Sequence, residues 1–429
     1  MRHRPRRFGL LAISPLFVMA ALFVALSIVA GGLSKVPILI VFVLTAVYAL
    51  SITRGLPLSK RIALFSKGAG SPDLVLMLWI FIFAGMFATA AKEMGAIEAT
   101  VNLALSILPS TMLVPSLFVA ACFISMSIGT SVGTIVALAP IGMGLSEQTA
   151  LPLSLITAAV VSGAFFGDNL SFISDTTIAA TRTQACAQKD KFRANIRIAL
   201  PAAIVAMLIY AFVGQHTDAD IHLQEIAWIK VLPYLVVIVT ALLGMNVLLV
   251  LSIGIFTTGI IGLATGTLTG ATWISASAMG IMGMAELCLV SMMAGGLMEL
   301  IRYNGGIIYL IHTLTRRVTG CRGAELSIAT LVGLTNLCTA NNTVAILSVG
   351  RLANDISTKY GVDKRRSASI LDTVSCCVQS IIPYGAQLLI ASGLTSLNPF
   401  DIIPYLFYPF VLIGTTLLAI LWPRGKRVQ

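Results

Sequence analysis

Long apolar runs, separated by short polar segments, make up most of this sequence and set the strongest limit on its fold. Of the 429 residues, 57% are hydrophobic and only 10% are charged, against roughly 25% charged residues in soluble domains. The mean hydropathy is +0.96. A chain with so few polar groups belongs in lipid, and its long runs exclude an outer-membrane barrel, which has short alternating segments. The sequence therefore predicts an all-α polytopic membrane protein with about 10–12 transmembrane segments.

The basic residues indicate a membrane topology and not nucleic-acid binding. There are 28 Lys and Arg against 17 Asp and Glu, but the basic residues lie between the apolar runs, as the positive-inside rule describes. The run 8–30 follows four arginines and is long enough to span, so we interpret it as a first transmembrane helix and not as a signal peptide. We expect a multi-pass protein of the bacterial cytoplasmic (inner) membrane, with both termini in the cytoplasm.

Two parts of the sequence resemble each other. Thr130–Leu138 aligns with Thr339–Leu347, and Ala84-Gly85 aligns with Ala294-Gly295 at nearly the same spacing. Weak internal similarity is typical of transporters built from repeats. We expect an N-terminal two-helix segment (1–72), repeat 1 (73–181), a cytoplasmic basic loop with connecting helices (182–278), repeat 2 (279–392), and a final helix with a cytoplasmic tail (393–429).

The loop charges indicate that the two repeats have inverted topologies. Repeat 1 ends in a basic segment, 182–197, whereas repeat 2 carries its basic residues internally, at 316–322 and 359–366, and none at its end. Basic loops stay in the cytoplasm, so the repeats must insert in opposite directions. Glycines and polar residues interrupt several runs, which predicts broken or re-entrant helices whose freed carbonyl oxygens can bind a cation.

Three aspartates, Asp168, Asp175 and Asp372, lie inside apolar runs. A charged carboxylate in the middle of a membrane helix costs about 2.5–3.5 kcal/mol on insertion scales, so we treat these residues as functional candidates. Hydroxyl and amide oxygens nearby suit a hard cation such as Na⁺, although a lone Ser or Thr more simply joins helices. The other candidates for ion or substrate binding are Thr130, Ser131, Asn169, Ser171, Ser174, Thr176, Thr177, Thr339, Asn341, Asn342, Thr343 and Gln387.

Other chemistries find little support in the sequence. It contains neither a phosphate-binding loop nor an H-E-x-x-H motif. Gly129–Gly133 fits the G-x-S-x-G pattern of serine hydrolases, but no strand precedes it and no histidine lies at membrane depth. We expect a transporter and not an enzyme, without a resident cofactor. We also expect no Lys or Arg at membrane depth, which favours a cation over an anion as cargo.

The segment Gly167–Thr177 resembles the G-D-x-[LM]-S-P-[LI]-S-D-T-T signature of NhaC-type sodium/proton antiporters, a family of the ion-transporter superfamily. Thr339–Thr343, Leu371–Thr373 and Ile382–Gln387 are similar to the same family. Phe172 departs from the signature, because the family commonly has proline there. The resemblance implies an inverted-repeat secondary transporter. Since the family also contains exchangers and co-transporters of malate, lactate or amino acids, the resemblance leaves the cargo open.

Our hypothesis from the sequence is the exchange of Na⁺ for H⁺, with Asp168 and Asp175 binding either a sodium ion or protons. Asn341 and Asn342 are further Na⁺ candidates, and Asp372 is a second carboxylate or a structural partner. The alternative is a Na⁺- or H⁺-coupled carrier or exchanger of a small organic anion or amino acid on the same fold. A channel is disfavoured, because no ring of identical filter sequences is present. The oligomeric state stays open, a homodimer included.

Overall fold

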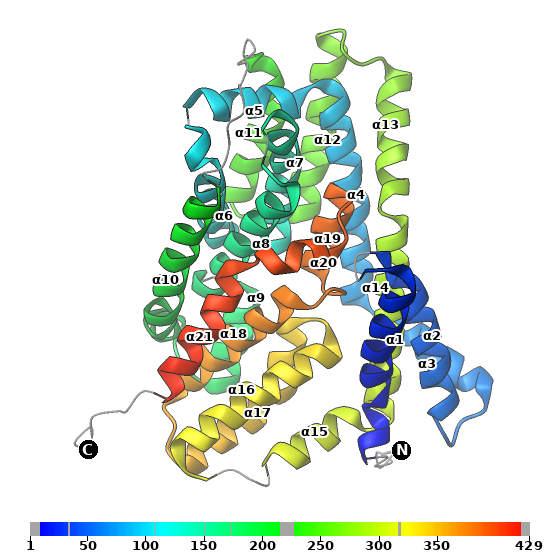
Figure 1. The fold of residues 1–429 in the computed structure, drawn as a ribbon, viewed down its shortest axis with the longest axis vertical. Helices are drawn as coiled ribbons and strands as arrows, with labels where there is room; N and C mark the ends of the chain where they lie inside the picture. The colour runs from blue at the N-terminus through cyan, green and yellow to red at the C-terminus, as the bar shows by residue number, and fades with distance from the viewer. Residues whose placement is uncertain are drawn as a thin grey trace.

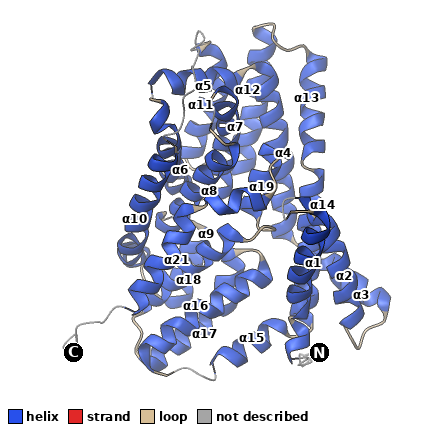
Figure 2. Ribbon diagram, in the orientation of Figure 1, coloured by secondary structure: helices blue, strands red, loops and turns tan. Residues whose placement is uncertain are grey.

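The computed structural model describes residues 9–32, 35–107, 109–149, 151–172, 174–214, 227–315 and 319–421. Within these residues every regular element is a helix (Figure 2). The basic residues before position 8, the acidic segment 218–225 and the tail from 424 lie outside the described residues, so the cytoplasmic placement of the termini stays a prediction.

The helices form two consecutive groups along the chain (Figure 1). The first group is α1 (Ser14–Ala30), α2 (Ile38–Ile52), α3 (Leu58–Ala69), α4 (Pro72–Met94), α5 (Ala96–Ile107), α6 (Leu113–Ile128), α7 (Ser131–Gln148), α8 (Leu153–Leu170), α9 (Asp175–Gln184) and α10 (Gln188–Val213). The second is α11 (Trp228–Leu242), α12 (Val247–Ala264), α13 (Gly270–Gly283), α14 (Ala285–Tyr303), α15 (Gly306–Thr315), α16 (Gly320–Thr339), α17 (Asn342–Tyr360), α18 (Lys364–Ile381), α19 (Ala386–Thr395), α20 (Pro399–Ile402) and α21 (Phe407–Leu421).

Many of these helices are long and apolar enough to cross a bilayer. In the described residues six helical segments meet this criterion, and a seventh does so if Pro399–Tyr405 and Phe407–Leu421, which meet at a 54° bend, form one span. Five shorter apolar helices, α1, α2, α5, α6 and α11, accompany them. The all-α polytopic architecture is therefore confirmed.

The two groups contact each other reciprocally. α7 packs against α19 while α17 packs against α9, and α4 packs against α12 while α14 packs against α2. α5 and α7 lie toward one end of the molecule and α15 and α17 toward the opposite end (Figure 1). This is the arrangement of two inverted repeats. The reciprocal contacts also include α2 and α12, which lie outside the predicted repeats; the boundaries 73–181 and 279–392 stay a prediction.

The core lies around α8 and α18. Every residue of α8 from Leu155 to Leu170 is buried, and α18 is buried over most of its length. α8 packs against α6 and α7, and α18 packs against α16 and α17. Apart from Ser154 of α8 and the basic start of α18 at Lys364–Arg366, the polar residues of these two helices lie in the protein interior.

α4 and α13 approach so closely that only glycine fits at their contact. A Cβ atom on Gly85 would overlap the carbonyl oxygen of Gly280, and a Cβ atom on Gly280 would overlap that of Gly85. Small residues allow this kind of close packing between membrane helices.

We expect the substitution Gly85→Ala to lower the free energy of unfolding by about 1–3 kcal/mol, because the added methyl group forces the two backbones apart. The measurement is the unfolding temperature of the purified protein in detergent. Gly414→Ala in α21 is the matched control, since nothing lies within 4 Å of a Cβ atom there. Equal stability of the two variants would contradict the close contact.

Candidate functional site

α8 and α9 are two parts of one helix that is broken between Leu170 and Asp175. The break forms although Phe172 replaces the expected proline. Ser174 caps the new helix, because its Oγ accepts a hydrogen bond from Thr177 N at 3.3 Å. Phe172 lies at the surface, 45% exposed, with its ring stacked on that of Phe192. Ser174 thus begins the new helix in the absence of the proline that the signature has at position 172.

The break leaves the last carbonyl groups of α8 without helical partners, and side chains of the protein satisfy them. Ser174 Oγ donates to Asp168 O at 3.0 Å, and Thr177 Oγ1 donates to Ser171 O at 2.8 Å. Unpaired helix-end carbonyls need such partners when they are buried. The oxygens that we expected to be free for a cation are therefore already hydrogen bonded at these two positions.

Two turns, one in each repeat, adjoin this break. Between α6 and α7, Gly129 has a φ of +77°, a value that favours glycine, and Thr130 is extended. Between α16 and α17, Ala340 has a φ of +49° and Asn341 is extended. Asn341 also caps α17, since its Oδ1 accepts a hydrogen bond from Val344 N at 3.0 Å. The two segments thus form the same local structure, but Thr130 corresponds to Asn341 and not to Thr339, so the structure shifts the sequence alignment by two residues.

Asp168 lies in the last turn of α8 and is only 5% exposed. Its Oδ1 accepts a hydrogen bond from Ser131 N at 3.0 Å. This amide is at the start of α7, where the helix dipole favours a negative charge. Ser131 Oγ in turn accepts from Gln387 Nε2 at 3.0 Å. Three predicted residues from α8, α7 and α19 therefore lie together.

Hydrogen bonds continue from Gln387 to the turn of the other repeat. Gln379 Nε2 donates both to Gln387 Oε1 and to Ala340 O, each at 3.0 Å. Gln387 thus connects the α6–α7 turn, through Ser131, with the α16–α17 turn. Both glutamines are buried, so this link crosses the interior between the two repeats.

We expect Gln387→Met to lower the free energy of unfolding by about 1–3 kcal/mol, because an isosteric apolar side chain removes the buried hydrogen bonds to Ser131 Oγ and from Gln379 Nε2. The unfolding temperature in detergent measures this. Gln188→Met at the exposed start of α10 is the control and should have no effect. If the two variants unfold alike, the link between the turns does not contribute to stability.

The structure brings a basic side chain to this site. Lys191 is 1% exposed, and its Nζ lies 2.8 Å from Oδ2 of the fully buried Asp372. The same Nζ donates to Asn169 O at 2.8 Å and to Thr177 Oγ1 at 2.6 Å. Asn195 Nδ2 donates to Asp372 Oδ2 at 2.7 Å and to Asn169 O at 2.9 Å. Asp372 is thus paired with a lysine, and the carbonyl oxygen of Asn169 accepts hydrogen bonds from both Lys191 and Asn195.

The segment 182–197, in which we expected a basic loop, is largely helical. The expectation of no Lys or Arg at membrane depth overlooked Lys191, which is buried beside Asp372. α9 extends to Gln184 and α10 begins at Gln188. The signal that could have revealed Lys191 is helical periodicity: the apolar stripe of α10 continues into the basic segment. The buried residues of α10 are Lys191, Asn195, Ile198, Ala199, Ala202, Ala203, Ala206 and Tyr210.

The other predicted residues differ in exposure. Thr176 and Asn342 are buried, and Asn342 Nδ2 donates to Cys376 Sγ at 3.9 Å. Asp175 is exposed in the first turn of α9, so the structure does not bury it with Asp168. The partly exposed candidates are Thr130, Thr339, Asn341 and Thr343. No group of three His, Cys, Asp or Glu side chains in the described residues is arranged to hold a metal ion.

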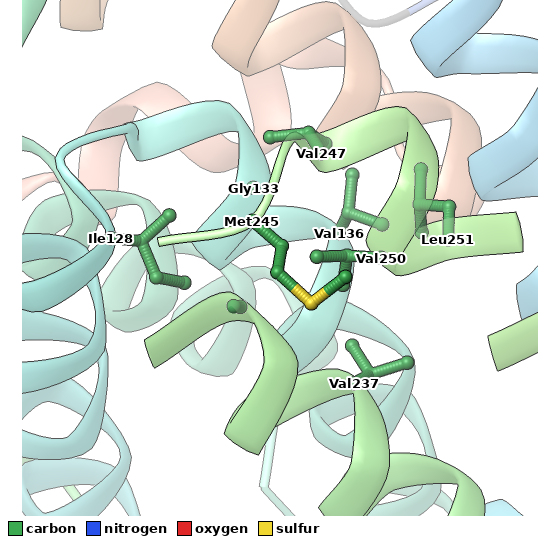
Figure 3. Close-up of a pocket in the computed structure, with 9 residues that line it drawn as sticks. Ile128, Gly133, Val136, Val237, Met245, Val247, Val250 and Leu251 are labelled. Carbon is green, nitrogen blue, oxygen red and sulfur yellow. The ribbon is translucent and has the colours of Figure 1, made fainter. Parts of the chain in front are cut away.

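The surroundings of the two turns differ. A cavity of ≈ 240 Å³ borders the α16–α17 turn and is lined by Thr339–Asn341, by Ser291 and Glu299 of α14, and by Tyr384. Beside the α6–α7 turn only ≈ 10 Å³ remains, about the limit for one water molecule. The apolar residues that fill this side are Ile128, Val136, Val237, Ala241, Met245, Val247, Val250 and Leu251 (Figure 3). The cavity beside the α16–α17 turn is thus much larger than the one beside the α6–α7 turn.

Comparison with known families matches nearly the whole chain. The model described as "Na+/H+ antiporter family" matches residues 8–215 and 217–422. The chain belongs to the Na⁺/H⁺ antiporter family. The NhaC-type resemblance of Gly167–Thr177 and the later segments is thereby confirmed. The two segments matched by the Na⁺/H⁺ antiporter family model contain α1–α10 and α11–α21, the same two groups that contact each other reciprocally.

Relatives in the Na⁺/H⁺ antiporter family carry names with different cargoes. The chain is 25% identical to the Na(+)/H(+) antiporter NhaC of Bacillus subtilis, over 80% of this chain and 82% of that protein. It is 23% identical to the malate-2H(+)/Na(+)-lactate antiporter of the same species, over 71% and 73%. It is 22% identical to the arginine/ornithine antiporter ArcD of Halobacterium salinarum, over 80% and 77%. The structural match to the solved YdaH transporter of Alcanivorax borkumensis covers 90% of this chain and 98% of that chain, with 13% sequence identity and a TM-score of 0.44.

Proposed function

We propose that this protein is a secondary active transporter that exchanges Na⁺ for H⁺, and that Asp168 is the carboxylate at which the two ions compete. The position of Asp168 supports this proposal most directly. It is buried at the helix break and bonded to the first amide of α7. A carboxylate in such a place is costly unless a cation or a proton neutralises it, so it is suited to hold each of them in turn.

Competition at one carboxylate would couple the two fluxes. A protonated Asp168 has no charge to attract Na⁺, and a bound Na⁺ requires the ionised form. The neighbouring Asn169 has a buried Oδ1 without a hydrogen-bond partner in the described part of the chain. This amide oxygen and the hydroxyl groups of Ser131 and Ser174 are the neutral ligands that we assign to the ion. Asp175 is exposed and could serve only at the entrance.

The inverted repeats support alternating access to this site. Asp168 contacts the α6–α7 turn directly and reaches the α16–α17 turn through Ser131, Gln387 and Gln379. The α16–α17 turn borders a cavity of ≈ 240 Å³, and the α6–α7 turn borders an apolar cavity of ≈ 10 Å³. Transporters of this architecture expose a central site to either side by moving one repeat against the other. The cavity beside the α16–α17 turn would then be the open entrance in this state.

The test uses purified protein in liposomes that contain a pH-sensitive dye. An inward Na⁺ gradient should raise the internal pH of the vesicles without any organic solute, and collapse of the gradient should reverse the change. Proton movement that requires an added organic acid or amino acid would overturn Na⁺/H⁺ exchange. For the cell we propose the bacterial inner membrane with both termini in the cytoplasm, on the basis of the positive-inside rule.

The second candidate is a coupled carrier or exchanger of a small organic anion or amino acid. The observation that favours it is the size of the ≈ 240 Å³ cavity, which is far larger than a site for one water-sized ion. Two relatives carry the names of malate/lactate and arginine/ornithine antiporters. Lys191 does not supply a free positive charge for such a cargo, because Asp372, Asn169 and Thr177 engage it. Adding malate, lactate or arginine to the same liposomes separates the two candidates.

A further inference from the structure

We propose that the oxygens around Lys191 Nζ form a second monovalent-cation site, which the protein fills with its own ammonium group. We call it the ammonium site; it consists of Asp372 Oδ2, Asn169 O and Thr177 Oγ1, which lie 2.8, 2.8 and 2.6 Å from Nζ. A carboxylate, a carbonyl and a hydroxyl oxygen are the ligands with which proteins replace the hydration shell of a hard cation. Asp168 contributes no atom to it, so the ammonium site is separate from the proposed exchange carboxylate.

The ammonium site is enclosed by the protein. Lys191, Asp372, Asn169 and Thr177 are each at most 1% exposed. All three donors of the ammonium group have an oxygen acceptor, so the group is fully saturated. Burying an ion pair is costly, and well-packed apolar residues are often at least as stable. A charged pair in this position therefore calls for a role beyond simple packing.

Further oxygens lie at the edge of the ammonium site. Asn195 Nδ2 donates to two of its three oxygens, Asp372 Oδ2 and Asn169 O. Asn195 Oδ1 and Asn169 Oδ1 are buried and have no hydrogen-bond partner among the described residues. Buried amide oxygens normally have a donor or an ion. If the ammonium group were removed, Asn195 Oδ1 could join the three ligands around an incoming ion, whereas Asn169 Oδ1 is the oxygen that we assign to the ion at Asp168.

The ammonium site joins the two repeats. Asn169 and Thr177 belong to α8 and α9, Asp372 belongs to α18, and Lys191 comes from α10, which packs against all three helices. Because the ammonium group is tethered to the chain, it cannot be exchanged for a cation from solution. The ion at Asp168 would then be the one that is exchanged. Lys191 thus limits exchange to one locus by occupying what would otherwise be a second exchangeable site.

The test measures cation binding and not transport. Purified Asp168→Asn protein in detergent is titrated with ²²Na⁺, and in a parallel arm with ⁸⁶Rb⁺ as a probe for K⁺. Adding Lys191→Ala to this background is expected to increase bound Na⁺ or Rb⁺ by one ion per chain relative to the parent. Adding Asp372→Asn as well should abolish the gain. Since the comparison is with the parent, it holds whether or not Asp168 is the exchange carboxylate.

Two matched variants control for nonspecific effects. Lys189→Ala removes an exposed lysine from the same helix, and Lys191→Met fills the space with a neutral chain; neither should gain an ion. A folded Lys191→Ala protein without the gain overturns the proposal, as does a gain that survives Asp372→Asn. If the Lys191→Ala protein cannot be recovered in choline chloride, its yield after purification in NaCl and in KCl is compared with the yield in choline chloride. Several-fold higher recovery in either salt supports the ammonium site, and equal loss in all three salts overturns it.

Discussion

Replacing Asp168 with asparagine is expected to reduce Na⁺-driven proton movement in liposomes to the level of protein-free vesicles, while the protein stays folded. Asparagine has the same size, and its amide oxygen can still accept the hydrogen bond that Ser131 N donates at 3.0 Å. The amide cannot take up or release a proton near neutral pH, and it carries no charge to attract Na⁺. The measurement is the internal pH after a Na⁺ pulse, together with size-exclusion profiles and unfolding temperatures.

Two other aspartates provide the comparison. Asp190 forms a surface ion pair with Arg365 at 3.7 Å, and such pairs contribute about 0–1 kcal/mol. Asp190→Asn should therefore exchange normally. The Asp175→Asn variant should keep part of the exchange activity, because the Asp175 side chain is exposed. Complete loss of exchange by this variant would show that Asp175 takes part in ion binding. Normal exchange by Asp168→Asn would refute the central role of Asp168.

The second large effect concerns the buried pair of Lys191 and Asp372. Either Lys191→Met or Asp372→Asn leaves one buried charge without its partner, which is expected to lower the free energy of unfolding by about 3–5 kcal/mol. The double variant removes both charges. We expect it to unfold closer to the wild type than either single variant does. Unfolding in detergent, in choline chloride so that no metal cation replaces the lysine, measures the three differences.

Non-additivity is the decisive result for this pair. Lys189→Met, at an exposed position two residues away, controls for the loss of a positive charge on α10 and should change stability little. If the losses of the two single variants simply add in the double variant, the two side chains do not stabilise each other. The 2.8 Å contact between Nζ and Oδ2 would then have no energetic role.

Local patterns were sufficient to predict the long apolar helices and the interruptions at the two turns, but not the helical form of 182–197. The aligned segments at Thr130 and Asn341 form turns of the same kind, because each combines a residue with positive φ and an extended residue before a new helix. Asp168, Ser131 and Gln387 were also predicted, since polar residues stand out in apolar runs. Their mutual contacts come from the reciprocal packing of α7 and α19, which no local pattern contains.

Lys191 and Asp175 show where sequence reasoning reached its limit. Lys191 lies among several basic residues, so its charge suggested a cytoplasmic loop, whereas its position on the buried face of α10 places it in the core. Asp175 lies in an apolar run, but it falls in the first turn of α9, directly after the helix break, where its side chain is exposed. Burial in both cases depends on where whole helices pack. The cavity beside the α16–α17 turn likewise depends on α14, which is distant in sequence.

The hydrogen bonds at the α8–α9 break have a consequence for ion binding at this break. The carbonyl groups of Asp168, Asn169 and Ser171 are satisfied by side chains of the protein itself. The interrupted helix is therefore preorganised, and no ligand is needed to assemble it. The binding free energy of a transported ion is then not reduced by the cost of ordering the backbone, so it can contribute fully to discrimination between ions.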